Sequence, residues 1–452
     1  MDWVYLGHAG WHLEAAGLRL CFDPLLDDLH HGGVFTVVPP RRVDAAALRA
    51  DYVLVSHRHP DHFDVRSLRR LAALDADTVV VTGDDLVART CRRLGFRRVE
   101  LVAPRQRIEL DGVRLVTTPS SAPAVEWGVM VACDAGVAWN QVDTVLDGPG
   151  GVRALLSESG AALGLEPLEL ALAIVRWQPL CEVQATTGAA AGFPRAEYAA
   201  GLEQIAALGA RALVPGAAGS CHAPPYAAMN GLVYPVSQAR FLRDAAARVP
   251  GTRCLPATVG GRYRVAGGAV EHEPDGGRSL VEPLGPDVSP LFRPFELPAL
   301  VDPDLGARRE PEARALVAAW LRTALVPALA RAYPALGCTR PLALALEVVF
   351  PSQVDGYTLR VAPGHATLEA TLDPEYDVLD AVAGSHLCDV IEGRRHWGEP
   401  LLAGLLRSSV RAYEVDQGGL RALPIAPMFL YYGLSYAESV ERATAWLLEH
   451  DD

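Results

Sequence analysis

The chain has 452 residues, about three times the ~150 of a typical domain, which predicts two or three domains. Half of the residues are hydrophobic and 21% are charged, as in ordinary globular proteins, and a formal charge of -13 without a long basic run argues against nucleic acid as a partner. Uninterrupted apolar runs fall short of the ~20 residues of a membrane span, so we expect a cytoplasmic protein with no membrane partner.

Two residue types exclude further chemistry. All 41 basic residues are arginine, because the sequence contains no lysine, and this excludes Schiff-base catalysis and a P-loop. The eight cysteines form no Cys-x-x-Cys and no Cys-x-His pair, which excludes zinc ribbons and a Rieske cluster within this chain. We expect reduced, mostly buried thiols.

From residue 1 to about 145, short β-rich runs alternate with amphipathic stretches, which predicts an α/β fold. The expected helices are Val65 to Leu74 and Asp85 to Leu94. The expected strands are Trp3 to Leu6, Leu18 to Phe22, Tyr52 to Ser56, Thr78 to Thr82, Val113 to Thr118, Gly128 to Cys133 and Val137 to Asn140.

The pattern continues to residue 265, and the prolines between Glu271 and Leu300 then indicate a linker over 266–300. We expect an α+β domain over 301–452. Expected elements of the second quarter are an apolar run at Leu168 to Val175, helices at Arg195 to Leu208 and Val236 to Ala247, and a strand at Ala212 to Pro215. Those of the last domain are a helix over Glu310 to Ala332, strands at Leu342 to Phe350, Tyr357 to Val361 and Ala366 to Leu372, and helical spacing from Ser385 to Leu406.

The strongest chemical signal follows the expected strand Tyr52 to Ser56. Here His57, His59, Asp61 and His62 leave the end of one strand within six residues. Desolvating so many ionisable groups is costly, and a bound divalent metal offsets that cost. The alternative is a polar loop that is rich in histidine by chance.

This His-x-His-x-Asp-His sequence resembles the signature of the metallo-β-lactamase superfamily, as do the segments Leu6 to Gly10 and Phe22 to Pro24. The resemblance covers residues 1–265 and implies an αββα sandwich with two metal ions. The closest likeness is to the metallo-β-lactamase-like part of CMP-N-acetylneuraminate hydroxylase. It is carried by Pro39-Pro40 and, in the same order, by Asn140 to Asp143, Gly192 to Pro194 and Val214 to Gly219.

The remaining ligands of that family map unevenly. Asp143 stands where the family has its bridging aspartate, with a turn cap as the alternative. The histidine that zinc hydrolases of this family usually have some fifty or more residues after the signature is absent, and Glu126 is the strong donor of that region. The resemblance implies the same replacement in the diiron β-hydroxylase of chloramphenicol biosynthesis. The alternative is that Glu126 is an ordinary surface residue. The last ligand of the family is a histidine after a late strand, and Gly216-Ala217 stand at that position here. His222 is the nearest imidazole. It could be a metal ligand, a residue that orients a ligand, or a plain loop residue.

We also expect residues around these ligands to orient them or to line a pocket. His8 is expected to orient a ligand through its other ring nitrogen, with a core histidine as the alternative. The segment His30-His31-Gly32-Gly33 predicts a solvated loop, with a lid over the site as the alternative. The other expected pocket or orienting residues are Asp23, Trp127, Asn140 and Thr187, with a place in the core as the alternative for Trp127 and a structural turn as the alternative for Thr187.

Two functions fit this ligand set. A donor set as rich in carboxylates as in imidazoles favours iron, so the first hypothesis is a diiron oxygenase that acts on a small molecule in a biosynthetic pathway, with O2 and an external electron donor as partners. The alternative is a dinuclear zinc or manganese hydrolase of a lactone, amide or phosphoester. Residues 301–452 are faintly similar to sterol-carrier domains and could shape an apolar pocket or a homodimer interface, with pure scaffolding as the alternative.

Overall fold

The computed structural model describes residues 1–122, 126–179, 181–189, 192–303, 306, 308–338 and 340–450. Contacts divide the chain into two compact units. Unit 1 contains Met1–Pro179, Phe193–Cys221 and Tyr234–Phe292, and unit 2 contains Leu180–Gly192, His222–Val233 and Arg293–Asp452. Both units are therefore discontinuous in sequence. The boundaries expected at residues 265 and 300 stay a prediction.

An eight-stranded mixed sheet forms one layer of unit 1. Its strand β3 pairs in parallel with β7, so that Phe22 lies opposite Leu54. Because parallel neighbours end at the same edge, Asp23 after β3 and Ser56 after β7 come side by side. In spatial order the strands are β19 (Ala269–Glu273), β18 (Arg262–Ala266), β1 (Asp2–Gly7), β2 (Gly10–Ala15), β3 (Leu18–Phe22), β7 (Tyr52–Val55), β8 (Val79–Thr82) and β9 (Arg98–Leu101).

A seven-stranded sheet forms the second layer, with antiparallel pairing up to β13 and parallel pairing beyond it. Asn140 at the end of β13 lies opposite Ile174 in β14, so the turn that carries Asp143 emerges beside Arg176. The strands in spatial order are β10 (Arg107–Leu110), β11 (Val113–Pro119), β12 (Trp127–Cys133), β13 (Gly136–Asn140), β14 (Leu172–Arg176), β15 (Ala212–Gly216) and β17 (Arg253–Cys254).

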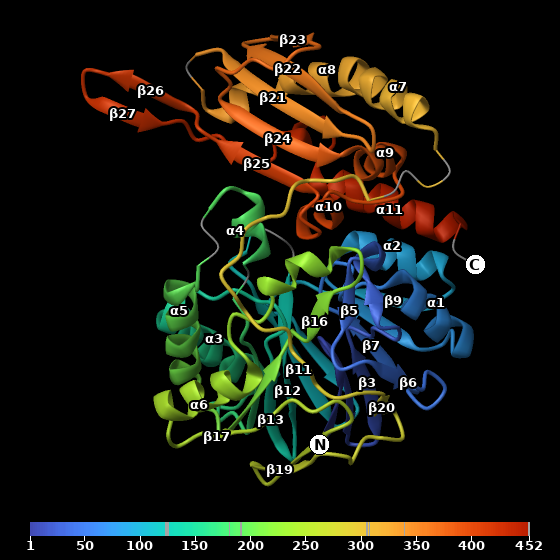
Figure 1. Ribbon diagram of the computed structural model, residues 1–452. Coiled ribbons are helices and arrows are strands. Elements are labelled where there is room, and N and C mark those ends of the chain that lie inside the picture. Colours follow the sequence, from blue (N-terminus) through green and yellow to red (C-terminus); the bar gives the residue numbers. More distant parts are fainter. Residues whose placement is uncertain are drawn as a thin grey trace. The chain divides into compact units, whose positions relative to one another are not determined.

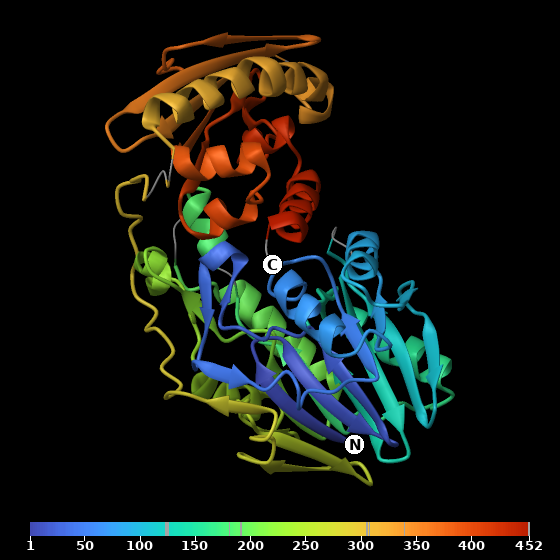
Figure 2. The ribbon, with the colours of Figure 1, turned by 90° about the vertical axis from the view of Figure 1, so that its right-hand side faces the viewer.

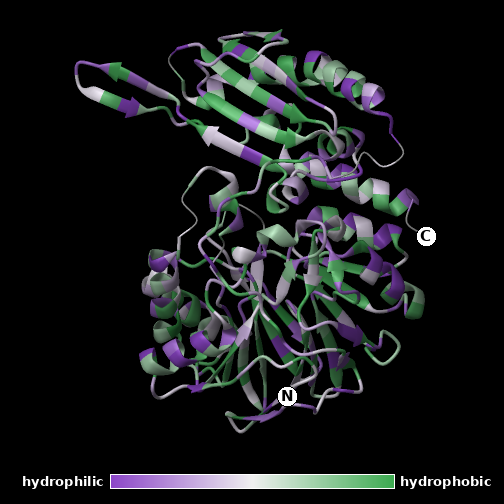
Figure 3. Ribbon diagram, viewed as in Figure 1, coloured by the Kyte–Doolittle hydropathy of each residue, from purple (hydrophilic) through white to green (hydrophobic). Residues whose placement is uncertain are grey.

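Helices cover the outer faces of both sheets, which completes the expected αββα sandwich (Figures 1 and 2). The helices α1 (Val65–Leu74) and α2 (Asp85–Arg93) lie over the first sheet, and α3 (Gly148–Leu163), α5 (Arg195–Leu208) and α6 (Gln238–Arg248) over the second. Figure 3 shows mostly hydrophobic strands between helices that carry both kinds of residue. Such helices bury one face and leave the other to solvent.

A buried arginine holds together the loops that lead to the expected site. The Arg41 guanidinium donates to the carbonyls of Leu6 and Leu25 over 2.6 Å each and pairs with Asp28. A charge in this position is tolerated because main-chain carbonyls and the Asp28 carboxylate accept the hydrogen bonds of the guanidinium. The surrounding short strands are β4 (Leu29–His30), β5 (Phe35–Val37), β6 (Arg41–Val43), β16 (Ser220–His222) and β20 (Val281–Pro283), the last inside the segment whose composition predicts a linker.

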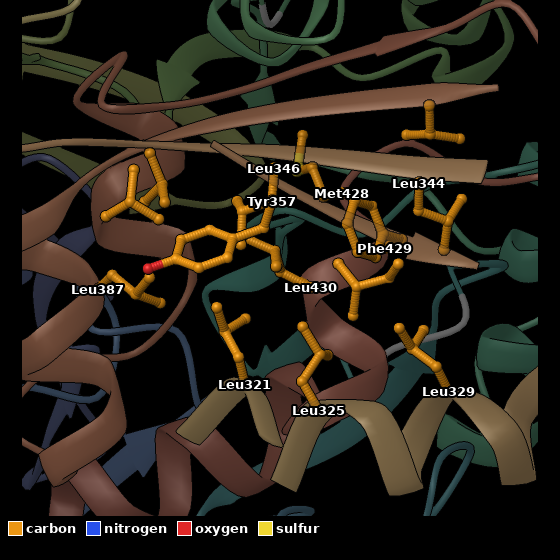
Figure 4. Close-up of a cluster of buried hydrophobic side chains, with 14 of the residues drawn as sticks. Leu321, Leu325, Leu329, Leu344, Leu346, Tyr357, Leu387, Met428, Phe429 and Leu430 are labelled. Carbon is orange, nitrogen blue, oxygen red and sulfur yellow. The ribbon is translucent and has the colours of Figure 1, made fainter. Parts of the chain in front are cut away.

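Unit 2 is built on a five-stranded sheet with its own hydrophobic core. Leu321, Leu325 and Leu329 point from a helix toward the sheet residues Leu344 and Leu346 (Figure 4). The sheet strands in spatial order are β23 (His365–Glu369), β22 (Val354–Ala362), β21 (Leu342–Val349), β24 (Val378–Ala383) and β25 (Leu406–Val410), and a hairpin of β26 (Tyr413–Asp416) and β27 (Gly419–Ala422) follows. The helices are α4 (Glu182–Thr186), α7 (Glu310–Trp320), α8 (Val326–Ala332), α9 (Gly384–Glu392), α10 (Gly398–Leu402) and α11 (Tyr436–His450).

The helical run Glu310–Leu336 contains a π-helical turn at Leu321–Leu325, where the amide of Val326 donates to the carbonyl of Leu321. Pro327 follows and has no amide hydrogen, which accounts for the widened turn. By its length and mean hydropathy of 1.3 this run could cross a membrane, a property that core helices of soluble proteins share. Its apolar residues, among them Leu321, Leu325 and Leu329, pack in the hydrophobic core of unit 2 (Figure 4).

Candidate metal centre

A tight turn after β7 gathers the signature residues. The amides of His62 and Phe63 both donate to the carbonyl of His59, which folds the loop back on itself. Arg58 points away and makes two hydrogen bonds, of 2.6 and 2.9 Å, to Asp84 at the start of α2. The loop is thereby anchored on one side while its imidazoles face the other.

The first donor group consists of His57, His59 and Asp143, whose ligand atoms lie within 4.8 Å of one another. The Nε2 of His57 lies 2.8 Å from Nδ1 of His59 and 3.8 Å from Oδ2 of Asp143. The Ser56 hydroxyl lies 2.9 Å from Nδ1 of His57 and fixes the plane of this buried ring. Three of the metal ligands expected from the sequence therefore lie together.

The second donor group consists of His8, Asp61 and His62, also within 4.8 Å. The Oδ2 of Asp61 lies 2.9 Å from Nε2 of His8 and 3.4 Å from Nε2 of His62. His8 therefore stands among the donors themselves. The Nε2 of His62 also lies 3.1 Å from Oδ2 of Asp143, so the two groups adjoin.

The surroundings of the His62 ring indicate whether a cation fits between the two donor groups. Its Nδ1 lies 2.9 Å from Oδ2 of Asp23, which accepts the Nδ1 hydrogen and leaves the Nε2 lone pair toward Asp61 and Asp143. Nε2 is buried and makes no hydrogen bond of normal geometry within the described residues. A lone pair facing two carboxylates is repulsive unless a proton or a cation lies between them, so the donors fit a metal ion.

Electrostatics support the same interpretation. Burial would lower the pKa of His62, but the carboxylates of Asp61, Asp143 and Asp23 outweigh it and raise this pKa well above its usual value. Burial, reinforced by the neighbouring imidazoles, lowers the pKa of His57 well below its usual value. The carboxylates therefore favour a positive charge at Nε2 of His62, which either a proton or a metal ion can supply. His57 is neutral, the form in which histidine binds metals.

His30 and His31 form a second layer of imidazoles around Asp61. Both rings are buried, so the expectation of a solvated loop is wrong. Their Nδ1 atoms lie 2.9 Å apart, and the Ser220 hydroxyl bridges Nε2 of His30 at 2.9 Å to Nδ1 of His8 at 3.1 Å. Adjacent histidines in a Gly-rich segment give no periodic signal of burial, which is why the sequence does not predict this contact.

Three other expected residues lie around the groups. Glu126 accepts a 3.3 Å hydrogen bond from the Ser120 hydroxyl, and burial together with the charge of Asp143 raises its pKa. Asn140 is buried and its Oδ1 accepts from the amide of Val142 at 3.3 Å, which shapes the turn before Asp143. Trp127 is buried against Gly83. Their roles toward a metal or substrate stay predictions.

Two expected residues fall in unit 2. His222 is the first residue of a unit 2 segment. Its Nε2 atom lies 2.9 Å from the carbonyl oxygen of Leu402. Thr187 donates its hydroxyl hydrogen to the Val183 carbonyl at 2.7 Å. Neither belongs to the two donor groups, and each contacts a main-chain carbonyl instead.

The Asp23 contacts predict the effect of Asp23→Asn. Asp23 accepts hydrogen bonds from the Ser56 amide, the Ser56 hydroxyl and His62 Nδ1, so an amide nitrogen placed toward His62 would donate to Nδ1 instead. The Nε2 atom would then carry the hydrogen and could not bind a metal. We expect metal affinity to fall about 10- to 100-fold, measured by competition with a chromophoric chelator. An unchanged affinity would contradict the assigned tautomer.

A two-sheet sandwich with adjoining His/Asp groups at the strand ends is typical of dinuclear metalloproteins of the metallo-β-lactamase fold. Residues 3–153 match the family model described as "Beta-lactamase superfamily domain". This part of the chain has the metallo-β-lactamase fold.

The chain is also similar to three named proteins. It is 28% identical over 241 residues to a Mycobacterium tuberculosis protein with the name of a Rieske 2Fe-2S iron-sulfur protein, over 50% of this chain and 45% of that one. It is 29% identical over 187 residues to a UPF0173 metal-dependent hydrolase of Opitutus terrae, over 37% of this chain and 72% of the relative. CmlA, a diiron β-hydroxylase from Streptomyces venezuelae, aligns at a TM-score of 0.32 and 16% identity, over 48% and 44% of the two chains.

Proposed function

We propose that this chain is a dinuclear metal-dependent hydrolase of a small molecule, with zinc or manganese as the ions. The proposal rests on the composition of the second donor group, in which His8 lies together with Asp61 and His62. Each group then offers two imidazoles and one carboxylate, a set richer in histidine than the sequence predicts. The similarity to a metal-dependent hydrolase over 72% of its length supports the same choice.

The bound ions would supply hydroxide by lowering the pKa of a bound water. The chain's own side chains have separate tasks. Asp23 fixes the His62 ring and Ser56 the His57 ring. Burial and the charge of Asp143 raise the pKa of Glu126, which suits this carboxyl group to accept a proton from water and donate it to the leaving group.

The second candidate is the diiron oxygenase, with O2 and an external electron donor as partners. The position of Glu126 favours it, because a carboxylate near Asp143 could bind iron directly and make the centre richer in oxygen donors. The similarity to proteins named for a Rieske cluster supports an oxidative pathway as well.

Glu126→Gln separates the two candidates. For the hydrolase we expect both metal ions to remain and kcat to fall about 10²- to 10⁴-fold on a metal-dependent substrate from a panel of lactones, esters and phosphodiesters. For the oxygenase we expect iron content to fall. Metal analysis and kinetics of the same preparations decide between them. A wild-type protein that hydrolyses the same substrate equally well after complete chelation would contradict a metal-dependent hydrolase.

A further inference from the structure

Unit 1 contains a cavity of about 400 Å³ between the turn after β13, the end of β14 and helix α5. Its apolar wall includes Trp139, Leu146, Val152, Trp177, Ile205 and Phe241. Ligand pockets occupy about 300–1,000 Å³. The cavity therefore has the size of a ligand site.

Helix α5 leaves this space open through its sequence. Gly201 lines the cavity, and a Cβ atom added there would meet nothing within 4 Å. Glycine within a helix lowers stability relative to alanine, so no gain in helix stability explains this residue. A larger side chain at position 201 would occupy the cavity, which provides a direct means of blocking it.

Arg176, at the end of β14, is the cation of the cavity. Its Nη2 donates to Oε1 of Glu197 over 3.3 Å, and its guanidinium has no other side-chain acceptor among the described residues. The two side chains are 28% and 41% exposed, and such pairs change an equilibrium by about fivefold at most. A ligand carboxylate can therefore replace Glu197 and form two parallel hydrogen bonds with the guanidinium.

The main chain of Arg176 is hydrogen-bonded to the turn that carries Asp143. The amide of Arg176 donates to Oε1 of Gln141 at 3.1 Å, and Nε2 of Gln141 donates to the Thr144 carbonyl at 3.0 Å. Gln141 and Thr144 flank Asp143 in the turn after β13. A group held by Arg176 therefore shares this turn with a member of the first donor group.

We propose that the cavity binds a small amphipathic carboxylic acid, with its carboxylate on Arg176 and its apolar body among the tryptophans. That this acid is the substrate of the metal centre rests on the proposed function, whereas its binding does not. Glu197 disfavours a simple anion without an apolar part, because only burial of that part would compensate for displacing an existing ion pair.

The test is calorimetric titration of the full, metal-containing chain with three probes of one shape: 3-phenylpropionate, 3-phenylpropanol and 3-phenylpropylamine. We expect the acid to bind at least about tenfold more tightly than the alcohol and the amine. Arg176→Gln should remove this preference, and Gly201→Leu should abolish binding of all three. Gly150→Leu, on α3 outside the cavity lining and also in open space, is the matched control and should change nothing.

His59→Ala separates this site from the metal, because a carboxylate could also bind a metal ion directly. We expect the acid to bind His59→Ala as it binds the wild type. Loss of binding in His59→Ala, equal affinity for acid and alcohol, or unchanged binding in Gly201→Leu would each overturn the proposal. A wild-type chain that takes up no metal when metal is supplied, yet binds the acid through Arg176, would reject the proposed function and leave this inference standing.

Discussion

Asp143→Ala is expected to remove both metal ions from the protein. Its Oδ2 lies 3.8 Å from Nε2 of His57 in the first donor group and 3.1 Å from Nε2 of His62 in the second. A carboxylate that adjoins both groups serves both ions, so its loss should exceed the about 100-fold cost of removing an outer partner. We expect elemental analysis to show less than a tenth of the wild-type metal and no measurable turnover.

Two variants make this result specific. His8→Ala removes a donor of the second group only, so we expect about half of the metal to remain. Asp134→Ala changes an exposed aspartate in the turn between β12 and β13 and should keep full metal content. Equal retention in Asp143→Ala and Asp134→Ala, with both variants folded by circular dichroism, would contradict the shared role of Asp143.

Asp380→Asn is expected to stabilise unit 2 above neutral pH. Asp380 lies on β24 with no exposed surface, and neither carboxylate oxygen makes a hydrogen bond of normal geometry within the described residues. Burial raises the pKa of Asp380 to about 7, although Ser408 and the amides of Met428 to Leu430 act in the opposite direction. Ionisation in the folded state is therefore unfavourable.

The sign of the pH dependence follows from the raised pKa. Below about pH 4 the carboxyl is protonated in both states and costs nothing. As pH rises toward 7, the unfolded chain loses its proton first, so wild-type stability falls by about 4 kcal/mol in total. The Asp380→Asn variant does not lose this stability. The difference in the free energy of unfolding between the variant and the wild type should therefore grow from near zero at pH 4 to a plateau above pH 7.

Hydrogen exchange of the β24 peptides at several pH values measures this difference locally. Asp416→Asn, at an exposed position of the same unit, is the control and should behave as wild type. A constant difference between Asp380→Asn and wild type from pH 4 to pH 8 would contradict a buried, titrating carboxyl. The pH range is broad enough to separate this titration from general acid effects.

Much of the fold could be predicted where local patterns are strong. Helix α1 begins and ends at the expected Val65 and Leu74, because apolar residues recur there at helical spacing and Asp64 caps its first turn. Helix α3 was not expected, since Gly148, Gly150 and Gly151 in its first turn hide the helical pattern. The helical spacing from Ser385 to Leu406 breaks after α9, where Gly393 adopts a left-handed conformation.

The site was predictable as far as it depends on one loop and one turn. His57, His59, Asp61 and His62 follow a single strand, and the signature alone indicates their common site. The contacts of His8 with Asp61 and of His30 with Ser220 join segments that are far apart in sequence, so only the folded chain brings them together. His222 was the nearest imidazole in sequence to the missing family ligand, but its partner is the Leu402 carbonyl.

Anomalous diffraction from crystals grown with zinc or manganese shows directly whether the two donor groups hold metal ions. We expect two peaks a few ångströms apart. One should lie within about 2.0–2.2 Å of donor atoms from His57, His59 and Asp143, and the other at similar distances from His8, Asp61 and His62. A single peak bound elsewhere on the chain, or none at these six residues in metal-saturated crystals, would contradict it.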